Sequence, residues 1–518
     1  MLRLHAPRQG FTRVSETGTG EVNEEAIESL TAIFYHDNNG SLTVDKIVAA
    51  EKVEESEEND FTVKYEGRAG NFPDYLGVIA NYDGEIGESH LSHKISGLHH
   101  DRLMVMSGTR YFDMNKRDTY YSLLSTENFM DSKPVDVFLE RAAAKITLSK
   151  ESNFEYKTPE IYHNGKKISL QLTICGWNVN ATDRETYLFK HLVSEGNYNL
   201  LYTALEQELT DATEEDNWKW NEYEYDAKNS KYPTLHWNHS ENYLIKDFPL
   251  AGKTKDDDDI IELLTYEEVD NEIGDAEEKG TIVYVHETTR PAEAGLLPNG
   301  MPEIVITGYY TLEGETPVTF YREGNEILTE AEYKIIIAGL QDSFYDGEGL
   351  KISEEMFWEL TEDAVPQSDV NYGFNQVCRQ LRESGLLSEE QEIYDKNGER
   401  IDFKNSLLIE KLNNELLVSL RVREKYEDGC CFFSFPVRHE RRGEGTGKYG
   451  IVRNHYYNIM LKSIEGIGSG IADKSLTLGR IEGVATEAPD YEINVTFLTM
   501  PWIAEEGGDV ELSETVDQ

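Results

Sequence analysis

The sequence predicts an all-β protein with more than one domain. Three observations support this prediction: short apolar runs alternate at a period of two, turn-forming residues separate these runs, and the chain of 518 residues is too long for one core. The hydrophobic content of 39% is sufficient to bury a sizeable core. We therefore expect β-sandwich architecture, with loops between short strands.

The first expected strand lies at the N-terminus. Apolar and polar residues alternate there until Pro7, which ends the strand because proline cannot donate to a ladder. The apolar positions are Leu2, Leu4 and Ala6. A polar link from Arg8 to about Asn23 follows, and it carries Arg13 in an open position. Proteases cut preferentially in links of this kind.

Further strands are expected throughout the chain, and residues 135–148 predict one long strand with a bend near 142–144. The other expected strands cover 29–35, 61–65, 75–80, 103–107, 168–178, 281–288, 303–312, 318–322, 416–422, 431–438 and 449–464. The irregular sequence between about 200 and 280 indicates insertions on this β framework. Residues 354–361 and 372–383 have helical apolar spacing, which predicts a helical hairpin within a loop.

The C-terminal tail, residues 491–512, predicts two consecutive strands. Apolar residues alternate in its first half, Pro501 ends that ladder, and a Gly507-Gly508 hinge precedes a second alternating stretch. Two destinations are open for this tail. It can close its own domain as the last strand, or it can complete the sheet of a neighbouring molecule by strand addition.

The charge balance limits the possible partners. Lys and Arg number 49 and Asp and Glu number 98, which gives a formal net charge of -49. A nucleic-acid backbone and an anionic membrane surface would both repel such a chain, whereas an extracellular location suits it. No apolar run approaches the ~20 residues of a membrane-spanning helix, and we expect any export signal to lie outside this chain.

The sequence contains no catalytic motif that we can identify. It has no zinc-protease helix, nucleophile elbow or phosphate loop, and the GIGSG segment at 466–470 indicates a turn. We therefore predict that the protein is not an enzyme and that it has no cofactor and no bound metal. The run Asp256–Asp259 lacks the ligand spacing of a calcium loop, so a solvated acidic loop is the simpler interpretation.

Two other residue groups have open interpretations. The aromatic residues between Trp218 and Tyr225 form either a platform for stacking sugars or partly buried packing under a long loop. The four cysteines are too few for a disulfide scaffold. Cys430 and Cys431 are expected on opposite faces of one strand, so at most one of them can pair with another cysteine.

Four blocks of the sequence resemble the major-subunit fimbrillins of type V fimbriae, the surface fibres of Bacteroidales-type bacteria. The blocks are VFLERAAAKITL at 137–148, CGWNVNATDRETYLFKHL at 175–192, the segment from GCCFFSF to GIGSG at 429–470, and INVTFLTMPWIAEE at 493–506. The most specific parts are GIVRNHYYNIMLKSIEGIG in the third block and the tail that contains Pro501. Residues 201–258 and 354–406 have no counterpart in the resemblance.

This resemblance implies two transthyretin-like β-sandwich domains in tandem, export as a lipoprotein, and removal of the first strand by an Arg-specific protease. Loss of that strand opens a groove, which the C-terminal strands of another subunit fill. On this chain the removed strand is Leu2 to Ala6 and the cut follows Arg13, with Arg8 as the second choice. The lipid-bearing cysteine of the family is missing, which departs from the family pattern.

The donor strands implied by the resemblance are Ile493 to Ile503 and Asp509 to Leu512. Their apolar side chains are Ile493, Val495, Phe497, Leu498, Met500, Trp502, Ile503, Val510 and Leu512. At about 1.5–3 kcal/mol per buried large side chain, burial of this donor would be more favourable by several kcal/mol than burial of the removed strand, which has three apolar residues. Donor and acceptor surfaces differ, so the contact is head-to-tail and generates a fibre.

The expected organisation follows from these points. Residues 1–13 form a strand removed on maturation, 14–150 an N-terminal sandwich, 151–490 a C-terminal sandwich with insertions, and 491–518 a donor tail. The expected partners are other copies of the chain, an Arg-specific maturation protease, and tip and anchor subunits, with no nucleic acid. The expected location is the outer membrane surface and the extracellular fimbria.

The sequence also leaves an alternative of another class. The chain can be a monomeric cell-surface module that binds glycans through residues 218–225, or a minor tip or anchor subunit. Under the monomeric reading the tail folds into its own domain, and cleavage after Arg13 changes nothing.

Overall fold

A computed structural model describes the strands of the framework together with many of their turns. The described residues are 2–5, 22–24, 26–38, 41–53, 60–67, 71–87, 93–109, 122–130, 135–189, 260–275, 280–289, 299–314, 316–333, 345–346, 393–394, 424–439, 449–479, 491–501 and 512–516. The expected helices at 354–361 and 372–383, the aromatic segment 218–225 and the aspartate run 256–259 lie outside these residues.

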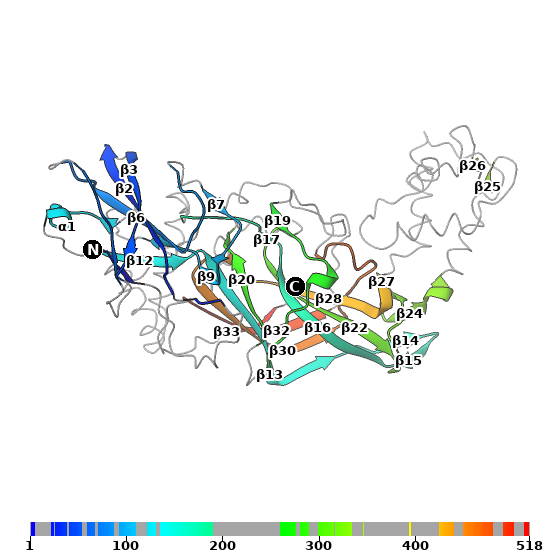
Figure 1. Cartoon of the computed structure of the whole chain (residues 1–518). Coiled ribbons are helices and arrows are strands. Elements are labelled where there is room, and N and C mark those ends of the chain that lie inside the picture. Colours follow the sequence, from blue (N-terminus) through cyan, green and yellow to red (C-terminus); the bar gives the residue numbers. More distant parts are fainter. Residues whose placement is uncertain are drawn as a thin grey trace.

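The N-terminal part of the chain forms one nine-stranded sheet, and Figure 1 shows most of its strands in blue at one end of the molecule. Its order is β3-β2-β6-β10-β12-β1-β5-β4, with β11 paired to β6. The strands are β1 (Leu2–His5), β2 (Leu30–Asn38), β3 (Ser41–Ala49), β4 (Glu51–Lys52), β5 (Asp60–Thr62), β6 (Tyr75–Ala80), β10 (Met106–Thr109), β11 (Ser122–Leu123) and β12 (Val135–Arg141). The strands β8 (His99–His100) and β9 (Leu103–Met104) form a short ladder, and β7 (Lys94–Ile95) pairs with a strand from a later part of the chain.

Three further sheets follow in the rest of the chain. The first has the order β20-β13-β30-β32-β33, the second β15-β14-β24-β23-β27 and the third β16-β22-β28-β31. The strands of the first are β20 (Ile282–His286), β13 (Ala143–Lys157), β30 (His455–Gly466), β32 (Tyr491–Pro501) and β33 (Leu512–Val516). The others are β14 (Ile161–His163), β15 (Lys166–Ile168), β16 (Leu170–Asn180), β22 (Glu303–Leu312), β23 (Phe320–Glu323), β24 (Glu326–Thr329), β27 (Glu424–Tyr426), β28 (Cys430–Pro436) and β31 (Ser469–Gly470).

Short two-stranded ladders and turns complete the framework. The ladders pair β17 (Thr182–Asp183) with β19 (Ile261–Glu262), β18 (Thr186–Tyr187) with β7, β21 (Thr288–Thr289) with β29 (Gly450–Ile451), and β25 (Tyr345–Asp346) with β26 (Ile393–Tyr394). Among the described residues, the helical elements include the short α1 (Thr126–Met130) and the 3-10 turns η3 (Tyr266–Glu268) and η5 (Glu427–Gly429), and residues 330–333 are also helical. Within the described chain, no helix has the length and apolar character to cross a membrane.

The main core lies between two sheets of the C-terminal part. Strands β13, β30 and β32 contribute Ile146, Ile459 and Val495, and the facing sheet contributes Trp177 and Phe433, all of them buried. The alternation seen in the sequence thus places one face of each strand inside the sandwich. This arrangement, with the nine-stranded sheet, confirms the predicted all-β fold.

The nine-stranded sheet has apolar clusters on both faces. Phe34 and Val137 belong to one buried cluster, whereas Ile33 and Tyr35 belong to another together with Leu188, which comes from the C-terminal part of the chain. The predicted long strand over 135–148 is present with its bend: β12 ends at Arg141, Ala142 forms the bend, and β13 continues into another sheet.

Candidate assembly site

The first strand, β1, lies inside the nine-stranded sheet. It pairs in parallel with β12 over four positions, from Leu2 opposite Val135 to His5 opposite Phe138. On its other side it pairs antiparallel with β5, where Leu2 lies opposite Phe61. The strand at the start of the chain therefore connects β5 and β4 to the rest of the sheet.

The neighbours of β1 include apolar, buried residues of β12 and β5. Val137 is 2% exposed, Phe61 is fully buried, and both belong to the core cluster of one sheet face. Leu4 holds the register position opposite Val137. Directly opposite residues in a ladder share a face of the sheet. A strand placed at this position thus borders the core of the N-terminal part.

At the other end of the chain, β32 pairs antiparallel with β30 over eleven positions. Three of its residues are buried in the main core: Ile493, Val495 and Phe497, each at most 3% exposed. The ring of Phe497 contacts Phe435 of the facing sheet edge-on, with 6.0 Å between ring centroids. The tail strand is therefore an integral part of its own sandwich in the monomer.

The outer part of the tail is attached differently. β33 is the last strand in the order of its sheet and pairs with β32 over five positions, Leu512 lying opposite Phe497. Leu498 and Met500 are placed by their backbone pairing with Asn458 and Tyr456. The remaining predicted site residues, namely Ala6, Arg8, Arg13, Trp502, Ile503 and Val510, lie outside the described residues.

The N-terminal and C-terminal sheets meet through a segment that follows β17. Thr186 pairs with Ile95 in the β18–β7 ladder. Leu188 and Phe189 are fully buried, and they pack into the apolar cluster on one face of the nine-stranded sheet. Residues 186–189 thus hook the C-terminal part of the chain onto the N-terminal part.

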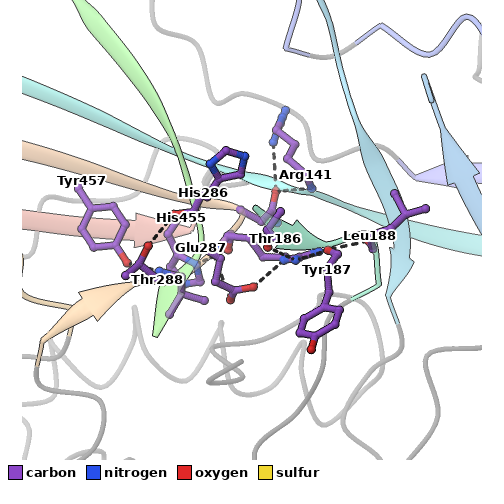
Figure 2. Close-up of polar contacts among 12 residues, drawn as sticks. Arg141, Thr186, Tyr187, Leu188, His286, Glu287, Thr288, His455 and Tyr457 are labelled. Atoms are coloured by element: carbon purple, nitrogen blue, oxygen red, sulfur yellow. Dashed lines mark hydrogen bonds and ion pairs between the residues drawn. The ribbon is translucent and has the colours of Figure 1, made fainter. Parts of the chain in front are cut away.

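A buried arginine holds this hook. Arg453 has no exposed surface, and its Nε lies 2.7 Å from Oε2 of Glu287, which is equally buried. Its Nη2 donates to Oγ1 of Thr186 at 2.8 Å and to the carbonyl of Tyr187 at 2.6 Å, and Nη1 donates to the carbonyl of Leu188 at 3.3 Å. Figure 2 shows the Glu287 carboxylate and the backbone of Tyr187 and Leu188 around this contact. The guanidinium is therefore charge-compensated and hydrogen-bonded, as a buried arginine must be.

Asn454 lies beside Arg453 and connects this contact to the bend between β12 and β13. Its backbone N–H donates to the carbonyl of Ala143 at 2.8 Å, and its Oδ1 accepts from the backbone N–H of Arg141 at 3.3 Å. Its φ of 59° is left-handed, a conformation that asparagine tolerates better than most residues. The sequence predicted an unbroken strand from 449 to 464. That prediction was wrong, because this turn separates β29 from β30.

The described residues show no arrangement for catalysis or metal binding that we can identify. No group of three or more His, Cys, Asp or Glu side chains among them is placed to hold a metal ion. Cys175, Cys430 and Cys431 are free thiols. As predicted, Cys430 and Cys431 belong to different apolar clusters, and burial raises the pKa of the Cys431 thiol well above its usual value, which disfavours a reactive thiolate.

Comparison with known proteins gives a family match over part of the chain. Residues 424–507 match the family model of the C-terminal part of fimbrillin, described as major fimbrial subunit protein type IV. This match confirms, for these residues, the resemblance to fimbrillins. It includes β28, β30, β32 and the turn with Arg453 and Asn454. A search of curated proteins finds no significant match.

Several solved structures also align with the chain. A fimbrilin from Porphyromonas gingivalis W83 aligns at 12% identity and a TM-score of 0.35, covering 98% of each chain. A proposed cell adhesion protein from Parabacteroides distasonis aligns at 9% identity and 0.34, covering 98% of each chain. One from Bacteroides eggerthii aligns at 10% identity and 0.36, covering 97% of this chain and 94% of the other. At these scores the alignments carry no argument about function.

Proposed function

We propose that this chain is a structural subunit of a bacterial surface fimbria, and that it assembles with other copies of itself by exchanging strands. The fimbrillin match over residues 424–507 supports the fimbrial role. The all-β framework supports assembly through strand pairing, because sheet edges and vacated strand positions accept strands of other chains.

The observation that carries the proposal is the position of β1. A four-residue strand at the start of the chain lies between β12 and β5, although its sequence neighbours lie elsewhere in the sheet. Cleavage of the predicted link after Arg13, or after Arg8, would separate β1 from the rest of the polypeptide. Departure of β1 would then leave β12 and β5 without a partner on the sides that faced it.

The proposed donor is the C-terminal tail of another subunit. The tail offers Trp502, Ile503, Val510 and Leu512 beyond the strand that closes its own core, and β33 is paired with β32 alone in the described sheet. We infer that this outer part enters the vacated position first. The residues of β32, from Ile493 to Met500, would follow only after they leave β30.

The energetics support this order. Withdrawal of Ile493, Val495 and Phe497 from the core would cost about 1.5–3 kcal/mol for each side chain. β33 has five ladder positions, all on β32 in the described sheet, whereas β32 has eleven on β30, so transfer of β33 breaks fewer of them. Because the donor end and the acceptor position lie in different parts of the chain, subunits would join head-to-tail and form an open fibre.

The proposed fibre defines the cellular setting. It would extend from the outer membrane surface, and its maturation would require an Arg-specific protease. Tip and anchor subunits would terminate it at its two ends. The repeated contact would occur between identical chains, and adhesion would be a property of the assembled fibre.

The test is to treat the purified chain with an Arg-specific protease and then compare unheated and heated samples on a denaturing gel, with electron microscopy of the same samples. We expect a heat-sensitive ladder and filaments. Arg13→Ala should abolish both, or Arg8→Ala if the cut lies there. A chain ending at Pro501 should be cut but remain monomeric, while its thermal unfolding shows that the core is intact.

Two outcomes would contradict the proposal. A trimmed chain that stays monomeric under all conditions would favour the monomeric surface module or a minor tip or anchor subunit. A glycan array with the same sample would then test the surface module. Filaments formed equally well by the chain ending at Pro501 would exclude the outer tail as the donor.

A further inference from the structure

Glu24 is a buried acid at the point where the described chain resumes after the N-terminal link. Its side chain is 8% exposed. A carboxylate is almost never this buried unless it is paired. Here Oε1 accepts from Nζ of Lys145 at 2.7 Å and from the hydroxyl of Tyr284 at 2.5 Å. The backbone carbonyl of Glu24 also accepts from Nε of Arg141 at 2.8 Å.

These three partners come from both parts of the molecule. Arg141 is the last residue of β12 in the nine-stranded sheet. Lys145 and Tyr284 lie directly opposite each other in the β13–β20 ladder of the C-terminal sandwich. Glu24 thus joins the end of β12 to a cross-strand pair of another sheet, next to the bend at Ala142.

The backbone around Glu24 is fixed as well. The N–H of Asn23 donates to the carbonyl of Arg102 at 2.6 Å. Asn81 accepts from the N–H of Glu28 at 3.0 Å and donates to the carbonyl of Ala26 at 2.8 Å. Ile27 has no exposed surface and belongs to the apolar core of the N-terminal part. The segment from Asn23 to Glu28 is therefore attached by polar and apolar contacts.

We propose that Glu24 is a positioning residue: it anchors the chain after the cleavable link, so that the departure of β1 leaves the wall of the vacated position in place. This inference rests on the proposed function. β12 forms that wall, and its register with β1 ends at Phe138, three residues before Arg141. Once β1 has left, residues 138–141 of β12 remain paired with β10, and contacts at Arg141 reinforce this end of the strand; Glu24 supplies one of them together with Asn454.

The anchor has a consequence for assembly. An acceptor that keeps its shape while empty binds a donor without first paying the entropy of ordering its own strand. With Glu24 in place, the departure of β1 changes only β5 and the half of β12 that faced β1. Without Glu24, the loosening caused by the loss of β1 would extend through residues 23–28 toward the contact between the N-terminal and C-terminal parts at Arg141 and Lys145.

Amide hydrogen exchange, followed by mass spectrometry on the full chain before and after cleavage with an Arg-specific protease, tests this inference. In the unmutated protein, cleavage should accelerate exchange in residues 60–62 and 135–138 and leave 23–29 and 139–141 unchanged. In Glu24→Gln, cleavage should accelerate exchange in 23–29 and 139–141 by about tenfold or more, the effect of losing hydrogen bonds to a charged group.

Two further variants keep the test decisive. Glu28→Gln is the matched control, because Glu28 lies on the same segment with 59% of its side chain exposed and pairs with Lys52; it should behave as the unmutated protein. Tyr284→Phe removes a single hydroxyl from the Glu24 carboxylate and should give a smaller acceleration in the same residues if Glu24→Gln fails to fold.

The inference is overturned if Glu24→Gln and Tyr284→Phe both respond to cleavage as the unmutated protein does. It is equally overturned if cleavage of the unmutated protein accelerates exchange in 23–29. Neither readout requires a polymer. A chain that never forms filaments but shows the expected exchange pattern would refute the proposed fimbrial assembly and retain the anchor.

Discussion

The strands near the two ends of this chain are held in opposite ways. β1 has four residues and lies between two partners, with four paired positions on β12 and two on β5. β32 has eleven paired positions on β30 and places three side chains in the main core. The N-terminal strand can leave without dismantling the sheet around β2, β6 and β10, whereas removal of the C-terminal strand opens a core. Under the proposed function, β1 is therefore the strand that is replaced.

The largest expected effect comes from removing β32 itself. Deletion of 491–518 withdraws Ile493, Val495 and Phe497, worth about 5–9 kcal/mol at about 1.5–3 kcal/mol each. That is comparable to the whole stability of a domain, about 5–15 kcal/mol. We expect the C-terminal unfolding transition to be lost in urea denaturation followed by tryptophan fluorescence. Deletion of 502–518 should preserve it; an equal loss in both truncations would refute the distinction between β32 and the outer tail.

The second effect tests whether the two regions respond independently. Arg453→Met leaves the buried carboxylate of Glu287 without its charge partner, which should lower the free energy of unfolding by about 3–5 kcal/mol. Because Arg453 holds the hook at 186–189, the variant should weaken both parts of the molecule. Urea denaturation with probes in each part would measure this.

Two controls define the meaning of the Arg453 result. Lys64→Met breaks the exposed pair with Glu51 and should change stability by at most about 1 kcal/mol. The double variant Arg453→Met with Glu287→Gln should recover part of the loss, because it removes the unpaired buried charge. No recovery would show that the hydrogen bonds to the hook matter more than the ion pair.

Sequence patterns were sufficient to predict strands of both the N-terminal sheet and the main core. Period-two alternation identified β2, β22, β28 and β32, and the bend between β12 and β13 was visible in the triplet Ala142 to Ala144. Trp177, which lies in the strand expected over 168–178, is fully buried in the main core. These predictions succeeded because alternation reports which face of a strand is buried, and burial decides the fold of a sandwich.

The buried polar contacts between the N-terminal and C-terminal parts could not be predicted from the sequence. Glu24, Glu287 and Arg453 are charged residues in a chain with 28% charged residues, and their burial depends on partners more than 100 positions away. The signal that was available is the segment around Arg453 and Asn454, which carried the family resemblance. Arg453, Asn454 and His455 form a short polar run between Ile451-Val452 and Tyr456-Tyr457.

The third prediction concerns the contribution of β1 to the stability of the N-terminal part. Removal of residues 1–13 deletes the ladder contacts of β1, and at about 0.5–1.5 kcal/mol per net hydrogen bond and one bond per residue, a four-residue strand contributes about 2–6 kcal/mol. We expect the N-terminal transition to shift by this amount and the C-terminal transition to stay unchanged. Addition of a peptide with the sequence of residues 491–518 should restore part of the lost stability. A shift of both transitions would contradict the separation of the two regions.

The smallest effect comes from pH and concerns the anchor of the N-terminal region. Burial raises the pKa of the Glu24 carboxyl. The ammonium of Lys145, the hydrogen bonds from Lys145 and Tyr284, and the charge of Arg141 together lower this pKa by more than burial raises it, so the pKa lies below the ordinary value of 4.5. Tyr456 also lies close enough to feel this charge. A lowered folded pKa means that the contribution is complete above about pH 4.5 and is lost as pH falls through the folded value.

The pH dependence of stability separates this carboxylate from the rest of the acidic chain. The difference in free energy of unfolding between the unmutated protein and Glu24→Gln should be constant from pH 7 to about 5, at about 1.5–3 kcal/mol for bonds to a charged group, and should shrink below pH 4.5. Urea denaturation at a series of pH values would measure it, with Glu28→Gln as the control that stays near zero throughout. A difference that grows as the pH falls would mean that burial outweighs the partners and that Glu24 destabilises the junction. The segment around Glu24 would then owe its attachment to the apolar contacts of Ile27 and the hydrogen bonds of Asn23 and Asn81, and loss of β1 would be free to spread toward β2.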